Sequence, residues 1–291
     1  SLVGSEMCIR DRFVQNPWYP IAEPSDAPAN DGMPDASRDL TSELVKLVQA
    51  MQEIKSEEDS RVNSYEIFVN QKQTRIRNSR GVDVTFSGFD CEIEVVTNSR
   101  KDDHEIEIYR DLRFSDKSAE KIIAEVRGMF HTGRQRLNAV PTRQNEHADV
   151  LLSGDAVGSF FQYFAMHTNA SYQYMGVAKT KIGEAITGAD ADPLNIRLVP
   201  TLDGSAKNAP YDETGMPVAE RVLFENGICR SYWGSLQHAH YIDMKDTTSM
   251  NNMVVEGGSK TLDELRSIPH IEITDFSAFD ICLLYTSPSP R

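Results

Sequence analysis

The sequence has little cysteine, no excess of basic residues and no long apolar run, and each absence excludes a class of protein. Its 4 cysteines include no Cys-x-x-Cys pair, so they form no disulfide framework and suit a reducing compartment. The formal net charge is −14, and no basic cluster is present to neutralise phosphates. No apolar run approaches the roughly 20 residues that span a bilayer. We therefore expect a cytoplasmic protein that binds neither nucleic acid nor membrane.

The two ends of the chain are related to each other at the level of DNA. Met7–Asp11 can be encoded by the start of ATGTGTATAAGAGACAG. The reverse complement of that segment, read from its second base, encodes Cys-Leu-Leu-Tyr-Thr, which is Cys282–Thr286. We interpret residues 1–12 and 282–291 as translated sequencing adapter and exclude them from fold reasoning. The native part, residues 13–281, is then expected to be a gene fragment that is open at both ends.

The remaining sequence has a globular composition, with 40% apolar and 8% aromatic residues. Leu40 to Ile54 carries apolar residues at helical spacing, and either Ser37 or Asp39 could be its N-cap. Between Tyr65 and Arg110, apolar and polar residues alternate, which predicts several short strands in an antiparallel meander with one wet face. Ser87-Gly88 is expected to be one of its turns. A second amphipathic helix, Ala119 to Leu137, is the expected cover of the buried face.

A polar linker, Asn138 to Glu146, divides the chain, and we place a domain boundary near residue 145. Residues 13–145 then form an α+β domain that is truncated at its start, and residues 146–281 form a β-rich domain that is truncated at its end. The expected fold class is α+β: an antiparallel sheet covered by helices, followed by a β-rich C-terminal domain with a core helix.

The C-terminal part opens on a strand, a turn and a helix. Val150–Leu152 is a short buried run, Ser153-Gly154 is a turn, and Asp155 is expected to be the N-cap of a helix that reaches about His167. Farther on, Asn226-Gly227 between two apolar runs predicts a hairpin. A strand that feeds a helix through small residues often presents catalytic groups, so this element is the natural place to look for chemistry.

Five short sequence motifs follow one another along the chain in an order that can be compared with known families. They are an NS-x-G turn (Asn78–Gly81), a VVLSP-like strand (Val150–Ser153), a DG…DxEGxP-like segment (Asp203–Pro217), an LIExG-like hairpin (Leu223–Gly227) and an N-x-x-x-x-G…EEL-like stretch (Asn252–Leu265). Each is weak alone, but their order and spacing resemble the TldD/PmbA family. Its members are metallopeptidase-related proteins that were once called modulators of DNA gyrase.

The resemblance implies a family with two kinds of subunit. The TldD-like subunit carries HExxxH on its core helix, where two histidines bind zinc and the glutamate takes a proton from water. The PmbA-like (TldE-like) subunit lacks this motif and pairs with the first. Laid on this chain, the motif places its first His at Gly154, its Glu at Asp155 and its second His at Ser159. These positions are vacant for zinc, and Asp155 fits a helix cap better than a base.

The resemblance therefore implies a zinc-free, PmbA/TldE-like subunit that is not catalytic alone and has no cofactor of its own. It would act in proteolysis or peptide maturation, on a peptide or unfolded protein, with zinc supplied by a TldD-like partner. The expected assembly is a heterodimer with that partner or a homodimer.

Two other functions stay open. One is a stand-alone, homo-oligomeric peptide-binding protein. The other is a divergent metallopeptidase: on a strand, His238 and His240 would point to one face, and Asp243 or Asp246 could add a carboxylate. Against this reading, the segment is expected to be a polar loop, where surface histidines without a metal are the ordinary case.

Overall fold

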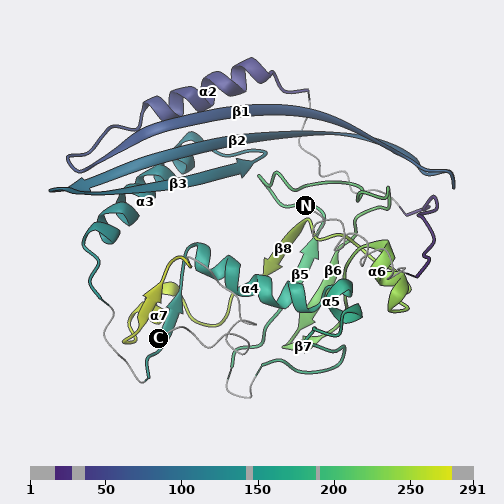
Figure 1. The fold of residues 1–291 in the computed structure, drawn as a ribbon. Coiled ribbons are helices and arrows are strands. Elements are labelled where there is room, and N and C mark those ends of the chain that lie inside the picture. Colours follow the sequence, from purple (N-terminus) through teal and green to yellow (C-terminus); the bar gives the residue numbers. More distant parts are fainter. Residues whose placement is uncertain (1–16, 28–36, 142–146, 188–190, 277–291) are drawn as a thin grey trace, which may run out of the picture.

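The computed structural model describes residues 17–27, 37–141, 147–187 and 191–276. The segments interpreted as adapter lie outside these described residues. Figure 1 shows a long, curved three-stranded sheet that crosses the molecule, with two helices against it and the smaller sheets and short helices of the C-terminal part beneath. The fold is α+β, as the sequence predicts.

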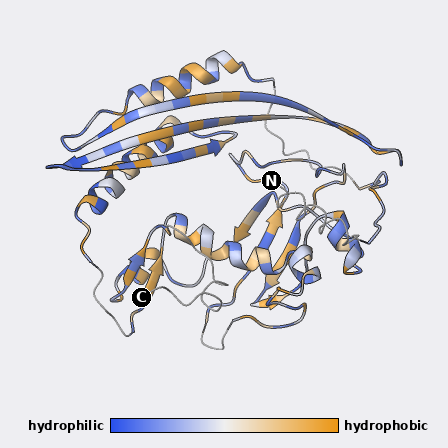
Figure 2. Cartoon of the chain, in the orientation of Figure 1, coloured by the Kyte–Doolittle hydropathy of each residue, from blue (hydrophilic) through white to orange (hydrophobic). Residues whose placement is uncertain are grey.

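The long sheet is an antiparallel meander in the order β1 (Ser60–Arg77), β2 (Asp83–Lys101) and β3 (His104–Phe114). Its strands are longer than expected, and the predicted turn at Ser87-Gly88 is wrong. Both residues lie inside β2, opposite Gln73 and Lys72 of β1. The reason is that β1 and β2 pair along almost their whole length, so the ladder continues through the glycine. Figure 2 shows the resulting alternation of hydrophobic and hydrophilic residues along both strands.

Two helices cover one face of this sheet, as predicted. The first, α2 (Leu40–Gln52), begins after Asp39, whose carboxylate accepts hydrogen bonds from the backbone N–H groups of Thr41 and Ser42. The second, α3 (Ala119–Leu137), begins after its N-cap Ser118. Together they bury the apolar side of the meander. The buried cluster consists of Leu47, Met51, Phe89, Cys91, Ile93, Val95, Ile108, Leu112, Phe114, Ile122, Val126 and Met129.

The C-terminal part contains two further sheets and four helices within the described ranges. A parallel pair joins β4 (Val150–Leu152) to β9 (Ile271–Ile273). An antiparallel sheet runs in the order β7 (Ile228–Cys229), β6 (Arg221–Glu225), β5 (Ile196–Val199) and β8 (Asn252–Val255). The helices are α4 (Asp155–His167), α5 (Ala170–Tyr174), α6 (Leu236–Tyr241) and α7 (Leu262–Arg266).

The predicted hairpin is confirmed between β6 and β7. Asn226 and Gly227 have φ values of 50° and 74°, the left-handed conformation that a tight hairpin turn requires. The core of this part forms where α4 packs on the four-stranded sheet, around Phe224, Leu223 and Ala165. Trp233 closes that core, and its Nε1 donates a hydrogen bond of 2.8 Å to the Ala165 carbonyl.

The two parts of the chain meet through polar contacts as well as packing. Arg136 of α3 forms an ion pair of 3.3 Å with Asp275, just after β9. The Ser115 N–H, after β3, donates a 2.8 Å hydrogen bond to the Gly204 carbonyl. No helix of the described ranges is both long and apolar enough to cross a bilayer.

Candidate functional site

The turn between β4 and α4 is held by the end of β9. The Ser153 N–H donates to the Ile273 carbonyl at 3.0 Å, and the Ala156 N–H donates to the Thr274 carbonyl at 3.1 Å. Gly154 lies between them with a φ of +57°, and a Cβ at this position would lie 3.0 Å from the Thr274 carbonyl oxygen. A side chain at position 154 would therefore be both strained and crowded.

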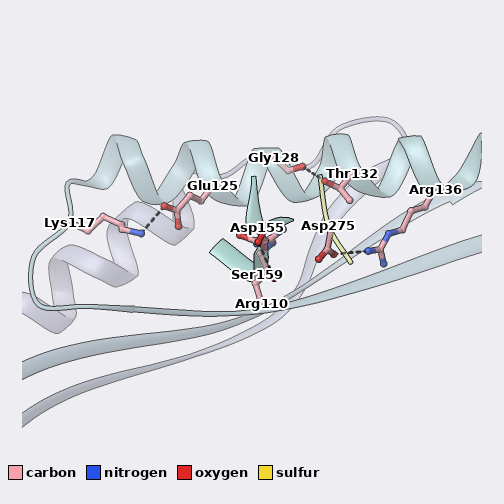
Figure 3. A network of polar contacts seen from close by, with 9 residues as sticks. All are labelled: Arg110, Lys117, Glu125, Gly128, Thr132, Arg136, Asp155, Ser159 and Asp275. Carbon is pink, nitrogen blue, oxygen red and sulfur yellow. Dashed lines mark hydrogen bonds and ion pairs between the residues drawn. The ribbon is translucent and has the colours of Figure 1, made fainter. Parts of the chain in front are cut away.

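Asp155 is not the N-cap that the sequence predicts. Gly154 occupies the cap position with no side-chain cap, and Asp155 is the first residue of α4. The helix starts one residue earlier than expected because the bonds to β9 tighten the turn. The Asp155 carboxylate instead forms an ion pair with Arg110 of β3, a contact between the two parts of the chain that Figure 3 shows.

Ser159 lies one turn farther along α4. Its Oγ donates a 3.2 Å hydrogen bond to the backbone carbonyl of Asp155, so the hydroxyl is used within the helix (Figure 3). Structural and catalytic zinc sites are built from imidazole, thiolate and carboxylate groups. Gly154 has no side chain, Ser159 is a hydroxyl and Asp155 is bound to a guanidinium. The residues at these three positions do not fit zinc.

The alternative metal site at His238 and His240 lies on a helix, so both the predicted strand geometry and the predicted loop are wrong. Residues two apart on a helix point about 200° apart around its axis, so these rings diverge. The His238 Nδ1 shares a 2.9 Å hydrogen bond with the Ser235 hydroxyl, and the His240 ring meets Trp18 edge-on. Asp243 follows α6 with a φ of 56°. Within residues 17–27, 37–141, 147–187 and 191–276, no three His, Cys, Asp or Glu side chains form a group that could hold a metal ion.

The two cysteines of the described part are free and buried. Burial raises the pKa of the Cys91 thiol and of the Cys229 thiol to about 11 in each case. A thiol with such a pKa is almost entirely protonated at neutral pH and is a poor nucleophile. The position of Cys229 in the core of the hairpin sheet agrees with its interpretation as a packing residue.

His167, at the end of α4, is a buried titratable group that sequence reasoning missed. Its side chain is 2% exposed, and its Nδ1 accepts a 3.1 Å hydrogen bond from the Lys179 N–H. The ring lies 4.1 Å from the ring of Tyr163. Desolvation, and then the charge of Lys179, lower the pKa of His167. The signal was present, because position 167 continues the apolar stripe of Phe160 and Phe164 at helical spacing.

We expect this histidine to make stability depend on pH. Because its pKa is lowered in the fold, the unfolded chain binds the proton first as pH falls below about 6.5, and stability decreases there by at most about 1.4 kcal/mol per pH unit. Urea unfolding between about pH 7.5 and 5.5 would measure this slope. His167→Gln should flatten it, whereas Met166→Leu, at the neighbouring position that is 37% exposed, removes no titratable group and should leave the slope unchanged. Equal slopes for the wild type and His167→Gln would contradict the assignment.

Comparison with known proteins identifies the class to which this architecture belongs. Residues 145–277, which include the β4–α4 turn and the hairpin, match the family model of the PmbA/TldA metallopeptidase C-terminal domain. The C-terminal part of the chain is therefore similar to the C-terminal domain of the PmbA/TldD family, over less than half of the 291 residues. No curated protein matches the sequence.

Solved structures show the same fold. TldE from Thermococcus kodakarensis is similar with a TM-score of 0.64 and 18% identity, over 89% of this chain and 63% of that one. A proposed modulator of a DNA gyrase from Thermotoga maritima gives a TM-score of 0.66 and 16% identity, over 89% of this chain and 62% of that one. A protein described in the same way from Bacteroides thetaiotaomicron gives 0.64 and 16%, with the same coverage. The chain thus spans about 62–63% of the length of these structures.

Proposed function

We propose that this chain is part of a PmbA/TldE-like subunit that acts in proteolysis or peptide maturation together with a zinc-bearing, TldD-like partner. One observation carries the proposal. The start of α4, where the family resemblance places HExxxH, presents a glycine with a positive φ, an aspartate paired with Arg110 and a serine that is hydrogen-bonded within the helix. None of these can supply the two imidazoles that the chemistry requires.

In this proposal, the chain contributes shape and binding surface, and the partner contributes the Lewis acid. The edge strand β8 pairs with β5 on one side. An edge strand of this kind can hold an extended peptide through backbone hydrogen bonds, which would align the peptide for cleavage by the partner. The free, buried cysteines suit a cytoplasmic setting for such an assembly.

The test is to co-express the chain with a HExxxH-bearing chain from the same genome. We expect the two to co-purify, zinc to be retained only when the partner histidines are intact, and peptidase activity to require both chains. Metal analysis of this chain alone is the control. Stoichiometric zinc in the isolated chain, with peptidase activity that is lost in His240→Ala, would show that the proposal is wrong. A stable homodimer that binds peptide and ignores the HExxxH chain would support the stand-alone binding protein instead.

Asp155→Asn separates a structural role from a catalytic one. Since the carboxylate is exposed and paired with Arg110, we expect a change of less than about 1 kcal/mol in the free energy of unfolding. The peptidase activity of the assembled pair should stay unchanged. Arg110→Gln is the matched variant, because it removes the same ion pair from the other side and should have the same small effect. A loss of activity in Asp155→Asn without a loss of stability would assign this carboxylate to the chemistry.

A further inference from the structure

The three-stranded sheet has one face that no helix covers in the described part of the chain. Both α2 and α3 pack on the face that carries Ile93 and Leu112. Because successive residues of a strand point to opposite faces, their neighbours form the other face. There, Glu66 lies directly opposite Glu94, and Glu94 lies directly opposite Asp111. Three carboxylates therefore form one row across all three strands.

Such a row is unfavourable in the isolated chain, because like charges directly opposite each other destabilise a sheet. Arg113 relieves one end of it. Its Nε contacts Asp111 and its Nη2 contacts Glu92, both at 2.7 Å. In the described residues, the carboxylates of Glu66 and Glu94 have no ion pair and no side-chain hydrogen bond. The centre of the row therefore lacks the cation that its end has.

Two aromatic rings flank the carboxylate row on the same face. Phe68 lies in the next row, opposite Glu92, and its side chain is 41% exposed. Tyr109 lies in the row on the other side, opposite Val96, and is 55% exposed. The pKa of Tyr109 is raised, first by desolvation and then by the charges of Glu94, Asp111 and Glu92, which places the ring within the field of the carboxylates.

We propose that this acidic face, defined by Glu66, Glu94 and Asp111 with Phe68 and Tyr109, docks an arginine-bearing polypeptide segment. A guanidinium binds carboxylates in a bidentate manner and also stacks on aromatic rings. The face offers both partners within neighbouring rows, which lie roughly 7 Å apart along a strand. The contacts of Arg113 show that this surface already accepts one guanidinium between two carboxylates.

Charge complementarity decides the kind of occupant. A second copy of this chain would bring the same carboxylates and a net charge of −14, so self-association through this face is disfavoured. A nucleic acid would be repelled for the same reason. A basic segment gains attraction to the row and covers the two exposed rings.

Fluorescence anisotropy with a short labelled peptide of alternating arginine and serine tests the proposal. We expect binding that weakens with salt, no binding of the corresponding glutamate–serine peptide, and affinity about 10-fold lower in Glu66→Gln/Glu94→Gln. The double variant should also melt at a higher temperature than the wild type, because the repulsion within the row is removed. This increase would show that lost binding is not lost folding.

The matched control is Glu53→Gln/Glu58→Gln, which removes the same charge away from the sheet face. If both double variants lose affinity equally, the attraction is general and the assigned face is wrong. Absence of binding at low salt would also overturn the proposal. A longer form of the protein that no longer binds the peptide would show that its own sequence covers the face.

Discussion

Phe224→Ala is expected to lower the free energy of unfolding by about 3–5 kcal/mol. The Phe224 side chain is 1% exposed, and its ring meets that of Phe164 edge-on at 5.8 Å. It therefore holds α4 against β6, and alanine would leave a cavity in the centre of that contact. The loss is a large share of the roughly 5–15 kcal/mol that stabilises an ordinary domain. Urea unfolding followed by the fluorescence of Trp233, which packs against the same core, would measure it.

Val222→Ala is the matched control for this prediction. Val222 lies on the same strand but is 41% exposed, so its truncation should change stability by less than about 1 kcal/mol. Similar losses in the two variants would mean that the strand, not the contact with α4, determines stability. In the proposed assembly with a TldD-like partner, Phe224→Ala should also weaken association, because Phe224 positions α4, whereas Val222→Ala should not.

Local signals predicted much of the fold. The cap at Asp39, the helical spacing before Ile54 and the left-handed pair Asn226-Gly227 are each determined by a few neighbouring residues, and the structure places them as expected. Such elements are recognisable because their physics acts over one or two turns of chain. The strand Val150–Leu152 also formed as predicted, but the prediction that it is buried was wrong, because Val150 is 55% exposed.

Features that depend on distant residues could not be predicted in the same way. Ser87-Gly88 was predicted to be a turn because the partner strand could not be known from the local sequence. In the structure, β2 pairs with β1 continuously through Gly88. The pair of Asp155 and Arg110 joins residues that are 45 positions apart. The tighter turn that displaced the helix start depends on hydrogen bonds to Thr274 and Ile273, which lie more than a hundred residues later in the chain.

The candidate site shows the same division. The residue types at Gly154 and Ser159 already argue against zinc, because neither side chain is an imidazole, a thiolate or a carboxylate. Only the structure shows what these residues do instead: Gly154 forms a tight turn with a positive φ, and Ser159 makes a hydrogen bond to the helix backbone. The carboxylate row is the extreme case, since Glu66 and Glu94 become neighbours only through the strand register. Register is fixed by the long pairing of whole strands, which no local pattern contains.

Alanine substitutions at two glycines of α3, Gly133 and Gly128, should change the free energy of unfolding in opposite directions. A Cβ at Gly133 would lie 2.8 Å from the Cβ of Ser99 on β2 and closer still to its hydroxyl. Ser99 is buried and shares a 2.8 Å hydrogen bond with Ser60, so it cannot move away freely. Overpacking of this kind destabilises by about 1–3 kcal/mol, which outweighs the roughly 1 kcal/mol that alanine gains in helix propensity. We expect Gly133→Ala to lower the free energy of unfolding in urea.

Gly128→Ala, on the exposed side of the same helix, is the matched control. A Cβ there meets nothing within 4 Å, so only the gain in helix propensity remains, and stability should rise by up to about 1 kcal/mol. Since both glycines lie on one helix, propensity alone predicts the same sign for both variants. Opposite signs would therefore show that α3 is pressed against the sheet at Gly133. A stabilising Gly133→Ala would mean that the helix stands farther from β2, and that Ser99 and Ser60 can rearrange without loss.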